Sequence, residues 1–185
     1  GIVVANIGDA SLGCGPVWEG LTFSAMDQFR ELWEGDMKGG LPIIFNIMNN
    51  QYGMGGQTCG ETMGYSIAAR VGAALNAALM HPERVDGFNP LVVIDAYERK
   101  MKIIEEKRGP VFLDVLTYRF SGHSPSDSSS YRSKEEIEAW ESVDSIVSYG
   151  NELLDAGVAD QSMLDKIKGE CDELIMGAFK LSIDE

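Results

Sequence analysis

The chain has 185 residues, of which 44% are hydrophobic, which is enough for a globular domain with a substantial core. Its 15 basic and 29 acidic residues give a net charge of −14, which repels a phosphate backbone and argues against nucleic-acid binding. The three cysteines, Cys14, Cys59 and Cys171, lack metal-ligand spacing, which favours reduced thiols in a cytoplasm or a mitochondrial matrix. We expect a soluble chain with no membrane segment and no signal peptide.

Two short apolar runs are each predicted to form a fully buried β-strand. The first, residues 2–7, is followed by the small and polar residues 8–15, and the second, residues 41–48, by residues 49–55. Parallel sheets bind ligands beyond the carboxyl ends of their strands, so both connections are candidate binding loops. Between them, Pro16 at a first helical turn and apolar residues at helical spacing predict a helix; these are Trp18, Leu21, Ala25, Phe29 and Leu32.

The middle of the chain is predicted to form two helices. Apolar spacing indicates an alanine-rich helix that begins at Ile67 and ends near His81 and Pro82. Asn89, followed by a proline, is typical of a helix cap, and this second helix is expected to run to about Lys107.

The last third of the chain contains one predicted strand and two predicted helices. Residues 111–116 are apolar enough for a buried strand, and Ser133 begins a capping box that starts a helix. Residues 160–179 place apolar side chains on one helix face. Strands alternating with helices predict an α/β fold, in which helices flank a parallel sheet on both sides.

Asp9 and Asn50 each follow one of the first two predicted strands. Carboxylate and amide oxygens are hard ligands, and glycine-rich backbone nearby supplies free amide groups. Together they suit a magnesium ion bound to phosphate. The plainer alternative is that Asp9 is an ordinary turn residue, since most Asp side chains in glycine-rich loops have that role.

The motifs in these two loops are followed by further, different motifs later in the chain. Gly8-Asp9, Asn49-Asn50 and residues 52–55 (Tyr-Gly-Met-Gly) are followed by residues 117–127, Thr-Tyr-Arg-Phe-Ser-Gly-His-Ser-Pro-Ser-Asp, and by Ser-Tyr-Arg at 130–132. In this order the motifs resemble the alpha chain of the thiamin-diphosphate-dependent decarboxylating component of 2-oxoacid dehydrogenase complexes. The resemblance covers essentially the whole chain, so residues 1–185 are expected to form its diphosphate-binding domain.

The resemblance implies a set of site residues. Magnesium is expected on the Asp9 carboxylate, the Asn50 side-chain oxygen and the Tyr52 carbonyl, while Asn49 is expected to be structural. His123 is expected at the diphosphate and the active-site entrance, in a catalytic role. The full set implied to bind thiamin diphosphate is Gly8, Asp9, Ala10, Asn50, Tyr52, Met54 and His123.

Several of these residues also have plainer interpretations. Tyr52 and Met54 suit ordinary packing, and His123 suits a solvated loop histidine. Ala10 stands where the family usually has glycine, which is tolerable only if the backbone angle there is ordinary. Residues 34–40 look like extra length in an exposed connection, where an insertion costs little loop entropy.

Arg119 and Arg132 flank a serine-rich loop that contains Asp127. We expect loop-ordering ion pairs and charge-assisted hydrogen bonds to hold this loop over the cofactor. Ser124 in the same loop matches a position that mitochondrial members of the family phosphorylate.

The resemblance also implies partners. The glutamate that activates the cofactor belongs in this family to a separate pyrimidine-binding domain, and no glutamate here matches it. We therefore expect a chain that is inactive alone and that lacks the N-terminal part of the family's domain. Its first expected partner is a beta subunit or a fused pyrimidine-binding domain. Its second is a lipoyl-bearing acyltransferase. A parallel sheet that lacks its upstream strands is expected to expose an apolar edge and face. We therefore expect the chain to self-associate or to bind a partner.

Three alternatives to a 2-oxoacid dehydrogenase remain open. Acetoin dehydrogenase shares the same motifs, and a transketolase-like enzyme is a more remote possibility. A non-catalytic assembly domain would keep the fold but not the cofactor.

Overall fold

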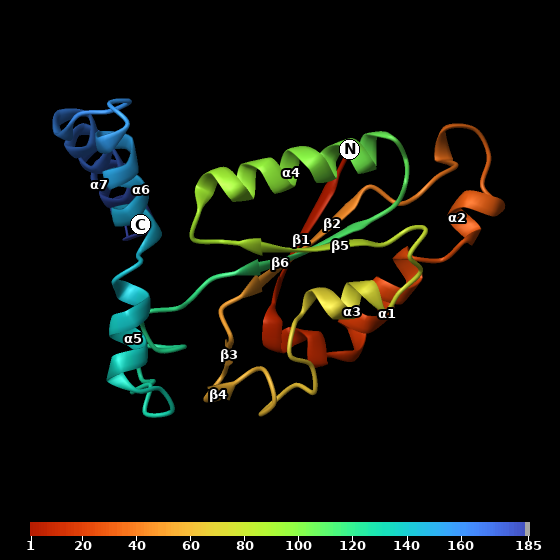
Figure 1. The fold of residues 1–185 in the computed structure, drawn as a ribbon, viewed down its shortest axis with the longest axis horizontal. Helices are drawn as coiled ribbons and strands as arrows, with labels where there is room; N and C mark the ends of the chain where they lie inside the picture. The colour runs from red at the N-terminus through yellow and green to blue at the C-terminus, as the bar shows by residue number, and fades with distance from the viewer. Residues whose placement is uncertain (184–185) are drawn as a thin grey trace. The chain divides into compact units, whose positions relative to one another are not determined.

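The computed structural model describes residues 1–183 and divides them into two compact units. The first, Gly1–Ser142, is an α/β unit around a four-stranded sheet (Figure 1). The second begins at Val143 and contains two helices, α6 (Ser145–Asp155) and α7 (Gln161–Ile183). No helix in residues 1–183 combines the length and the apolarity needed to cross a membrane.

The four strands are all parallel, in the order β1-β2-β6-β5. Their bounds are β1 Val3–Gly8, β2 Ile43–Asn49, β5 His81–Asp86 and β6 Val111–Leu116. Two central apolar strands, β2 and β6, are buried, whereas the outer strands are polar or partly exposed. The predicted parallel α/β sheet is therefore confirmed.

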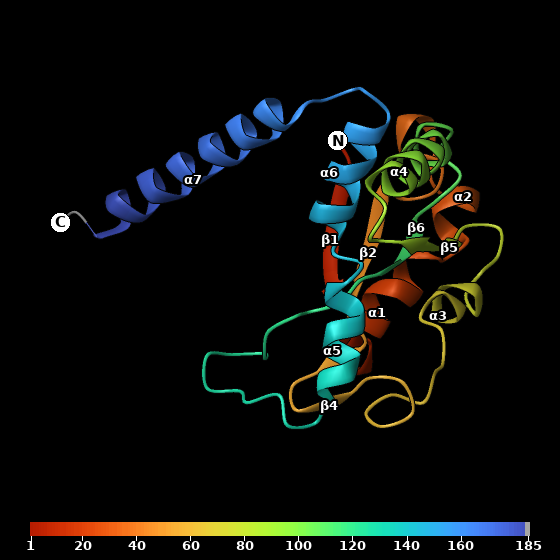
Figure 2. The ribbon, with the colours of Figure 1, turned by 60° about the vertical axis from the view of Figure 1, so that its left-hand side comes forward.

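Helices cover both faces of this sheet, and each face has its own core. Helix α4 (Pro90–Glu105) packs on one face, while α1 (Gly15–Ser24) and α3 (Ala69–Ala73) lie on the other (Figures 1 and 2). The α4 core includes Ile44, Val85, Ala96, Ile104, Val111, Leu113 and Val115. The opposite core includes Leu12, Leu21, Phe45, Ile47, Ala68, Val71 and Phe112.

The remaining elements of the first unit are short. They are the 3-10 helices η1 (Asp9–Gly13) and η2 (Gly35–Met37), helix α2 (Gln28–Glu31), the hairpin strands β3 (Tyr52–Gly53) and β4 (Gly56–Gln57), and helix α5 (Lys134–Glu141). Helix α7 has the predicted position, but its apolar side chains are mostly exposed within the described residues.

Strand β1 differs from its predicted full burial. It lies at the edge of the sheet, with Val3 58% and Val4 48% exposed. The apolar run alone could not reveal this, because burial depends on which elements cover the strand. The structure thus has the apolar edge that we expected, and self-association through it stays a prediction.

Strand β5 was not predicted, and the helix before it is much shorter than expected. Helix α3 ends at Ala73, and the Asn76 side chain then bonds to two backbone groups: Oδ1 accepts from the neighbouring Ala78 amide at 3.1 Å, and Nδ2 donates to the carbonyl of Ala25, which is distant in the sequence, at 3.2 Å. Such side-chain bonds compete with helical pairing. Pro82 is tolerated in β5 because this strand is at an edge.

Three sequence-based boundaries are confirmed. Helix α4 begins after Asn89, whose side chain accepts hydrogen bonds from two amides of the first turn. Strand β6 has the predicted bounds, and α5 begins after Ser133, whose side chain accepts from the Glu136 amide. The helix predicted from Pro16 is interrupted: α1 ends at Ser24, and the short α2 follows after a turn.

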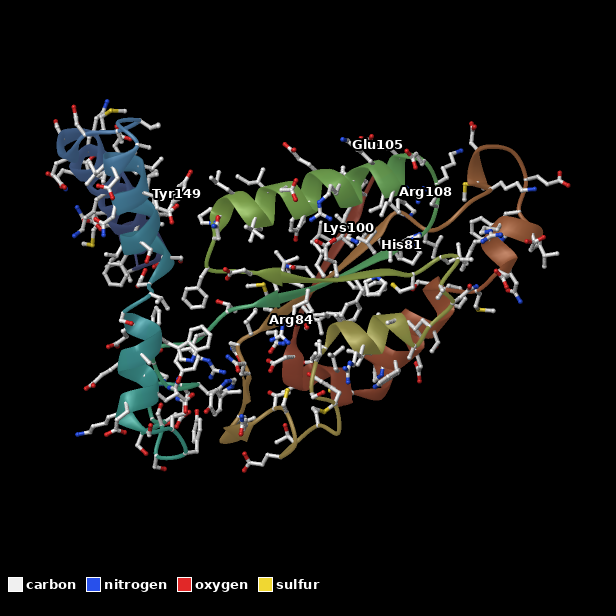
Figure 3. All side chains as sticks on the ribbon, in the orientation of Figure 1. His81, Arg84, Lys100, Glu105, Arg108 and Tyr149 are labelled. Carbon is white, nitrogen blue, oxygen red and sulfur yellow. The ribbon has the colours of Figure 1, made fainter. Side chains whose placement is uncertain are left out.

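A buried carboxylate connects three segments beneath the carboxyl ends of the strands. Asp114 of β6 is completely buried and accepts from Asn49 Nδ2 at 2.7 Å and from the Ala69 amide at 3.0 Å. The Arg84 side chain, which lies on the opposite side of the sheet from Lys100 (Figure 3), approaches Asp114 at 3.9 Å. Asn49 is therefore structural, as predicted, and its fixed position places Asn50 at the end of β2.

Candidate functional site

The candidate site lies where β1, β2 and β6 end side by side. Gly8 pairs with Met48, and Asn49 pairs with Leu116, so Asp9, Asn50 and residue 117 leave the sheet at the same edge. A pocket of about 480 Å³ opens there. Its lining residues are Gly8, Asp9, Ala10, Ser11, Cys14, Asn50, Tyr52, Gly53, Met54, Arg119 and His123.

This pocket brings together every residue predicted for the site. Gly8, Asp9 and Ala10 come from the end of β1 and from η1, and Asn50 from the end of β2; the hairpin supplies Tyr52 and Met54, and the serine-rich loop supplies His123. Four further lining residues were not in the predicted set, namely Ser11, Cys14, Gly53 and Arg119. Of these, Gly53 and Arg119 stood in motifs that the sequence had singled out.

Asp9 has an unusual environment for a carboxylate. Its side chain is 2% exposed, and its Oδ2 atom has no hydrogen-bond partner in residues 1–183. Burial raises the pKa of Asp9 above its ordinary value, while the nearby Thr58 hydroxyl, the Ala10 amide and the charge of Arg119 act in the opposite direction. The Tyr65 hydroxyl donates to the Asp9 backbone carbonyl at 2.9 Å, which fixes the backbone but leaves the carboxylate oxygen free. A buried carboxylate oxygen without a partner is costly, which makes Asp9 a candidate for binding a ligand.

Asn50 and Tyr52 are held by the turn that joins β2 to the hairpin. Gln51 between them has a positive φ of 69°, and Asn50 Oδ1 accepts from the Tyr52 amide at 3.1 Å. The Tyr52 carbonyl accepts from Arg119 Nη2 at 3.0 Å. Side-chain and carbonyl oxygens each have a second lone pair, so both atoms remain able to bind a cation.

A metal ion in this pocket would be bound by a carboxylate, a side-chain amide and a backbone carbonyl rather than by a cluster of charged side chains. Within residues 1–183, no group of three or more His, Cys, Asp and Glu side chains converges to hold a metal ion. A cation here would bind the Asp9 carboxylate, an amide oxygen and a backbone carbonyl, with further oxygens from its own ligand. Mg²⁺ is commonly bound in this way, through one or two carboxylates plus phosphate oxygens.

Ala10 is accommodated without strain. It lies in η1 and is not among the residues of positive φ, so its methyl group has no backbone cost. The methyl group packs toward Gly53, where an added Cβ would lie 3.0 Å from the Ala10 Cβ. Glycine at position 53 therefore complements alanine at position 10.

A cluster of aromatic rings fixes the other side of the hairpin. Glu136 Oε1 accepts from the Tyr52 hydroxyl at 2.7 Å and from the Tyr118 hydroxyl at 2.9 Å. The Arg132 guanidinium lies 5.3 to 5.7 Å from the centroids of three tyrosine rings, Tyr52, Tyr118 and Tyr131. Burial, followed by the bond to Glu136, raises the pKa of Tyr52 well above its usual range, so this tyrosine remains a hydrogen-bond donor. The sequence indicated Glu136 only as part of a capping box.

The serine-rich loop is held by charge-assisted hydrogen bonds, as predicted, but, among the described residues, not by the predicted ion pairs. Neither Arg119 nor Arg132 forms an ion pair with Asp127 in the described part of the chain. Arg132 instead donates to the Arg119 carbonyl and to the Ser121 carbonyl, the latter at 2.8 Å. Asp127 accepts from three donors within the loop: the His123 amide and the Ser129 amide, both at 2.8 Å, and the Tyr131 hydroxyl at 2.7 Å.

We predict that Asp127→Ala loosens this loop without unfolding the protein. The Tyr131 hydroxyl, followed by the two amides, lowers the pKa of Asp127 to about 2, so the ionised form is the one that these donors stabilise. Its contribution is complete above about pH 4 and is lost as the pH falls toward 2. At neutral pH the amides of His123 and Ser129 are expected to exchange with solvent roughly tenfold faster in the variant.

Hydrogen-exchange mass spectrometry or NMR measures this effect. Asp127→Asn is the matched control, because an asparagine keeps one acceptor oxygen and should show a smaller increase. Unchanged exchange at both amides in Asp127→Ala would contradict the role that we give to this carboxylate.

The fold and the pocket place this chain in the class of open parallel α/β proteins, which bind ligands beyond the carboxyl ends of their strands. The family model described as "Dehydrogenase E1 component" matches residues 1–185. The chain therefore belongs to the dehydrogenase E1 component family.

Individual relatives agree with this family. The pyruvate dehydrogenase E1 component subunit alpha of Rickettsia prowazekii is 31% identical over 177 residues, which are 96% of this chain and 51% of that protein. The protein of the same name from Rhizobium meliloti is 30% identical over 175 residues, 94% of this chain and 46% of the relative. The one from Rickettsia felis is 29% identical over 176 residues, with coverages of 95% and 49%. The chain thus spans about half the length of these relatives.

Proposed function

We propose that this chain is the diphosphate- and magnesium-binding part of a thiamin-diphosphate-dependent 2-oxoacid dehydrogenase. One observation supports the proposal most strongly: Asp9, whose buried Oδ2 atom has no hydrogen-bond partner in residues 1–183, lines the same pocket as Asn50 and Tyr52. The family membership supports the enzyme class, and the relatives' names favour pyruvate as the oxoacid.

The chain's own residues would bind and orient the cofactor. Asp9 would remain ionised next to a divalent cation, because the cation's charge opposes the effect of burial on the pKa of Asp9. Asn50 and Tyr52 would complete the protein ligands, and His123, which is exposed at the pocket, would donate a hydrogen bond to a phosphate oxygen. Thiamin diphosphate, when bound, supplies the thiazolium carbon that attacks the oxoacid.

The proposal includes partners. A beta subunit or a pyrimidine-binding domain would supply the carboxylate that activates the cofactor, and a lipoyl-bearing acyltransferase would accept the acyl group. All three relatives reported above are named as alpha subunits, which supports the need for a second component. A homo-oligomer that covers the exposed edge of β1 is part of the same proposal, and so is a location in a cytoplasm or a mitochondrial matrix.

Calorimetric titration of thiamin diphosphate into the protein, with its partner subunit present, tests the function. We expect binding with Mg²⁺ and none when EDTA removes it, because the cation neutralises the diphosphate in a chain of net charge −14. Binding that is absent with Mg²⁺ and partner, or that is unchanged by EDTA, would contradict the proposal. Complete absence of binding would favour a non-catalytic assembly domain.

A further inference from the structure

Arg119 has a buried guanidinium nitrogen without a hydrogen-bond acceptor among residues 1–183. It follows the end of β6 by three residues and lines the pocket. Its Nη2 atom donates to the Tyr52 carbonyl at 3.0 Å, whereas its Nη1 atom is buried and has no hydrogen-bond partner in residues 1–183. A buried N–H group of a charged side chain without an acceptor costs more than an ordinary lost hydrogen bond, so an acceptor from a ligand is expected there.

The Asp9 carboxylate does not act as the acceptor for Arg119. Asp9 lines the same pocket and has an unpartnered Oδ2 atom, yet Asp9 and Arg119 form no ion pair in the part of the chain that the structure describes. The pocket is therefore lined by two separate unsatisfied groups, the anionic acceptor Asp9 Oδ2 and the cationic donor Arg119 Nη1. A ligand that joins a metal cation to a phosphate anion matches both groups at once.

We propose that Arg119 is a further cofactor-binding residue, whose Nη1 atom donates to a phosphate oxygen of the metal-bound diphosphate. This inference rests on the function proposed above. The guanidinium group is permanently charged and planar, so its hydrogen bond to phosphate is charge-assisted and its two nitrogens are fixed relative to each other. Arg119 thus ties the position of the phosphate to the Tyr52 carbonyl, which Nη2 holds.

The electrostatics of the chain make this cation important. Of the described residues that line the pocket, Arg119 is the only permanently charged base, while the chain as a whole has a net charge of −14. The backbone of Arg119 is itself held, because Arg132 Nη1 donates to its carbonyl oxygen. The donor is therefore positioned before any ligand arrives, and little ordering is needed when a phosphate binds.

Inorganic pyrophosphate with Mg²⁺ is the probe that tests this role, by titration calorimetry at fixed ionic strength. We expect Arg119→Met to weaken pyrophosphate binding roughly tenfold or more, and Arg119→Lys to weaken it less, because lysine keeps the charge but not both donors. Arg30→Met is the matched control: this arginine is on α2, outside the pocket, and the variant should bind as the wild type does.

A second measurement separates phosphate binding from support of the Tyr52 carbonyl. Binding of Mn²⁺ alone, followed by electron paramagnetic resonance, should change by less than about twofold in Arg119→Met, since the proposed hydrogen bond is to phosphate and not to the metal. If Mn²⁺ alone loses as much affinity as the metal–pyrophosphate complex, Arg119 acts only through Tyr52 and the proposal is overturned.

The remaining outcomes are also decisive. If the wild type binds metal–pyrophosphate and Arg119→Met binds it equally well, the inference about Arg119 fails while the proposed function stands. If the wild type itself does not bind metal–pyrophosphate, both fail.

Discussion

Asp9→Asn is expected to weaken Mg²⁺-dependent binding of thiamin diphosphate by roughly 100-fold or more. Loss of a residue that merely supports a metal ligand costs roughly 10- to 100-fold in metal affinity, and Asp9 is the proposed ligand itself. Among residues 1–183, it is also the only carboxylate that lines the pocket. An amide keeps the size of the side chain and removes its charge, so the variant tests charge rather than packing.

Asp9→Asn should not destabilise the fold, which distinguishes a binding role from a structural one. Burial raises the pKa of Asp9, so in the metal-free protein the ionised carboxylate lowers stability as the pH rises above about 4. The variant lacks that penalty and should unfold in urea at the same concentration as the wild type or at a higher one near pH 7. A large loss of stability would show that Asp9 is mainly structural.

Asp86→Asn is the matched control for the binding measurement. Asp86 ends β5 and is likewise an aspartate at the carboxyl end of a strand, but it does not line the pocket. Its variant should bind thiamin diphosphate as the wild type does. Equal losses in the two variants would mean that overall charge, and not the Asp9 carboxylate, governs binding.

Asp114→Ala is expected to cause the largest loss of stability, roughly 3–5 kcal/mol. Removing this fully buried carboxylate leaves the Asn49 side-chain amide and the Ala69 backbone amide without their acceptor, and Arg84 without its nearby anion. Because Asn49 precedes Asn50, the variant should also weaken cofactor binding. Urea unfolding monitored by circular dichroism measures the stability change.

A reciprocal exchange provides the control for Asp114. In the double variant Asn49→Asp with Asp114→Asn, a carboxylate at position 49 can accept from an amide at position 114, so the buried hydrogen bond is restored with its polarity reversed. We expect this double variant to be more stable than Asp114→Ala. Wild-type stability in Asp114→Ala would show that the buried network contributes nothing.

The sequence predicted the parts of the fold whose signals are local. Asn89 and Ser133 cap α4 and α5 as expected, because side-chain caps depend on a few neighbouring residues. Strand β6 has its predicted bounds because five of its six residues are apolar and it is buried almost along its whole length, with Asp114 as the one charged residue. By contrast, the polar edge strand β5, with Pro82 near its start, has no alternating or apolar pattern to indicate it.

The site was predictable as a set of residues but not as a set of interactions. Ordered motifs identified Asp9, Asn50 and His123, and the structure places all three around one pocket. The sequence could not show that Asp127 pairs with amides rather than with arginines, or that Glu136 accepts from two tyrosines, because these partners depend on how the loop folds back.

Diffraction from crystals grown with Mn²⁺ and thiamin diphosphate is the most direct test of the central claim, that Asp9 and Asn50 bind one divalent ion. Anomalous scattering locates the metal without reference to its ligands. We predict a single ion with the Asp9 carboxylate and the Asn50 side-chain oxygen both within about 2.3 Å. An ion bound elsewhere, or one that contacts neither side chain, would contradict the claim.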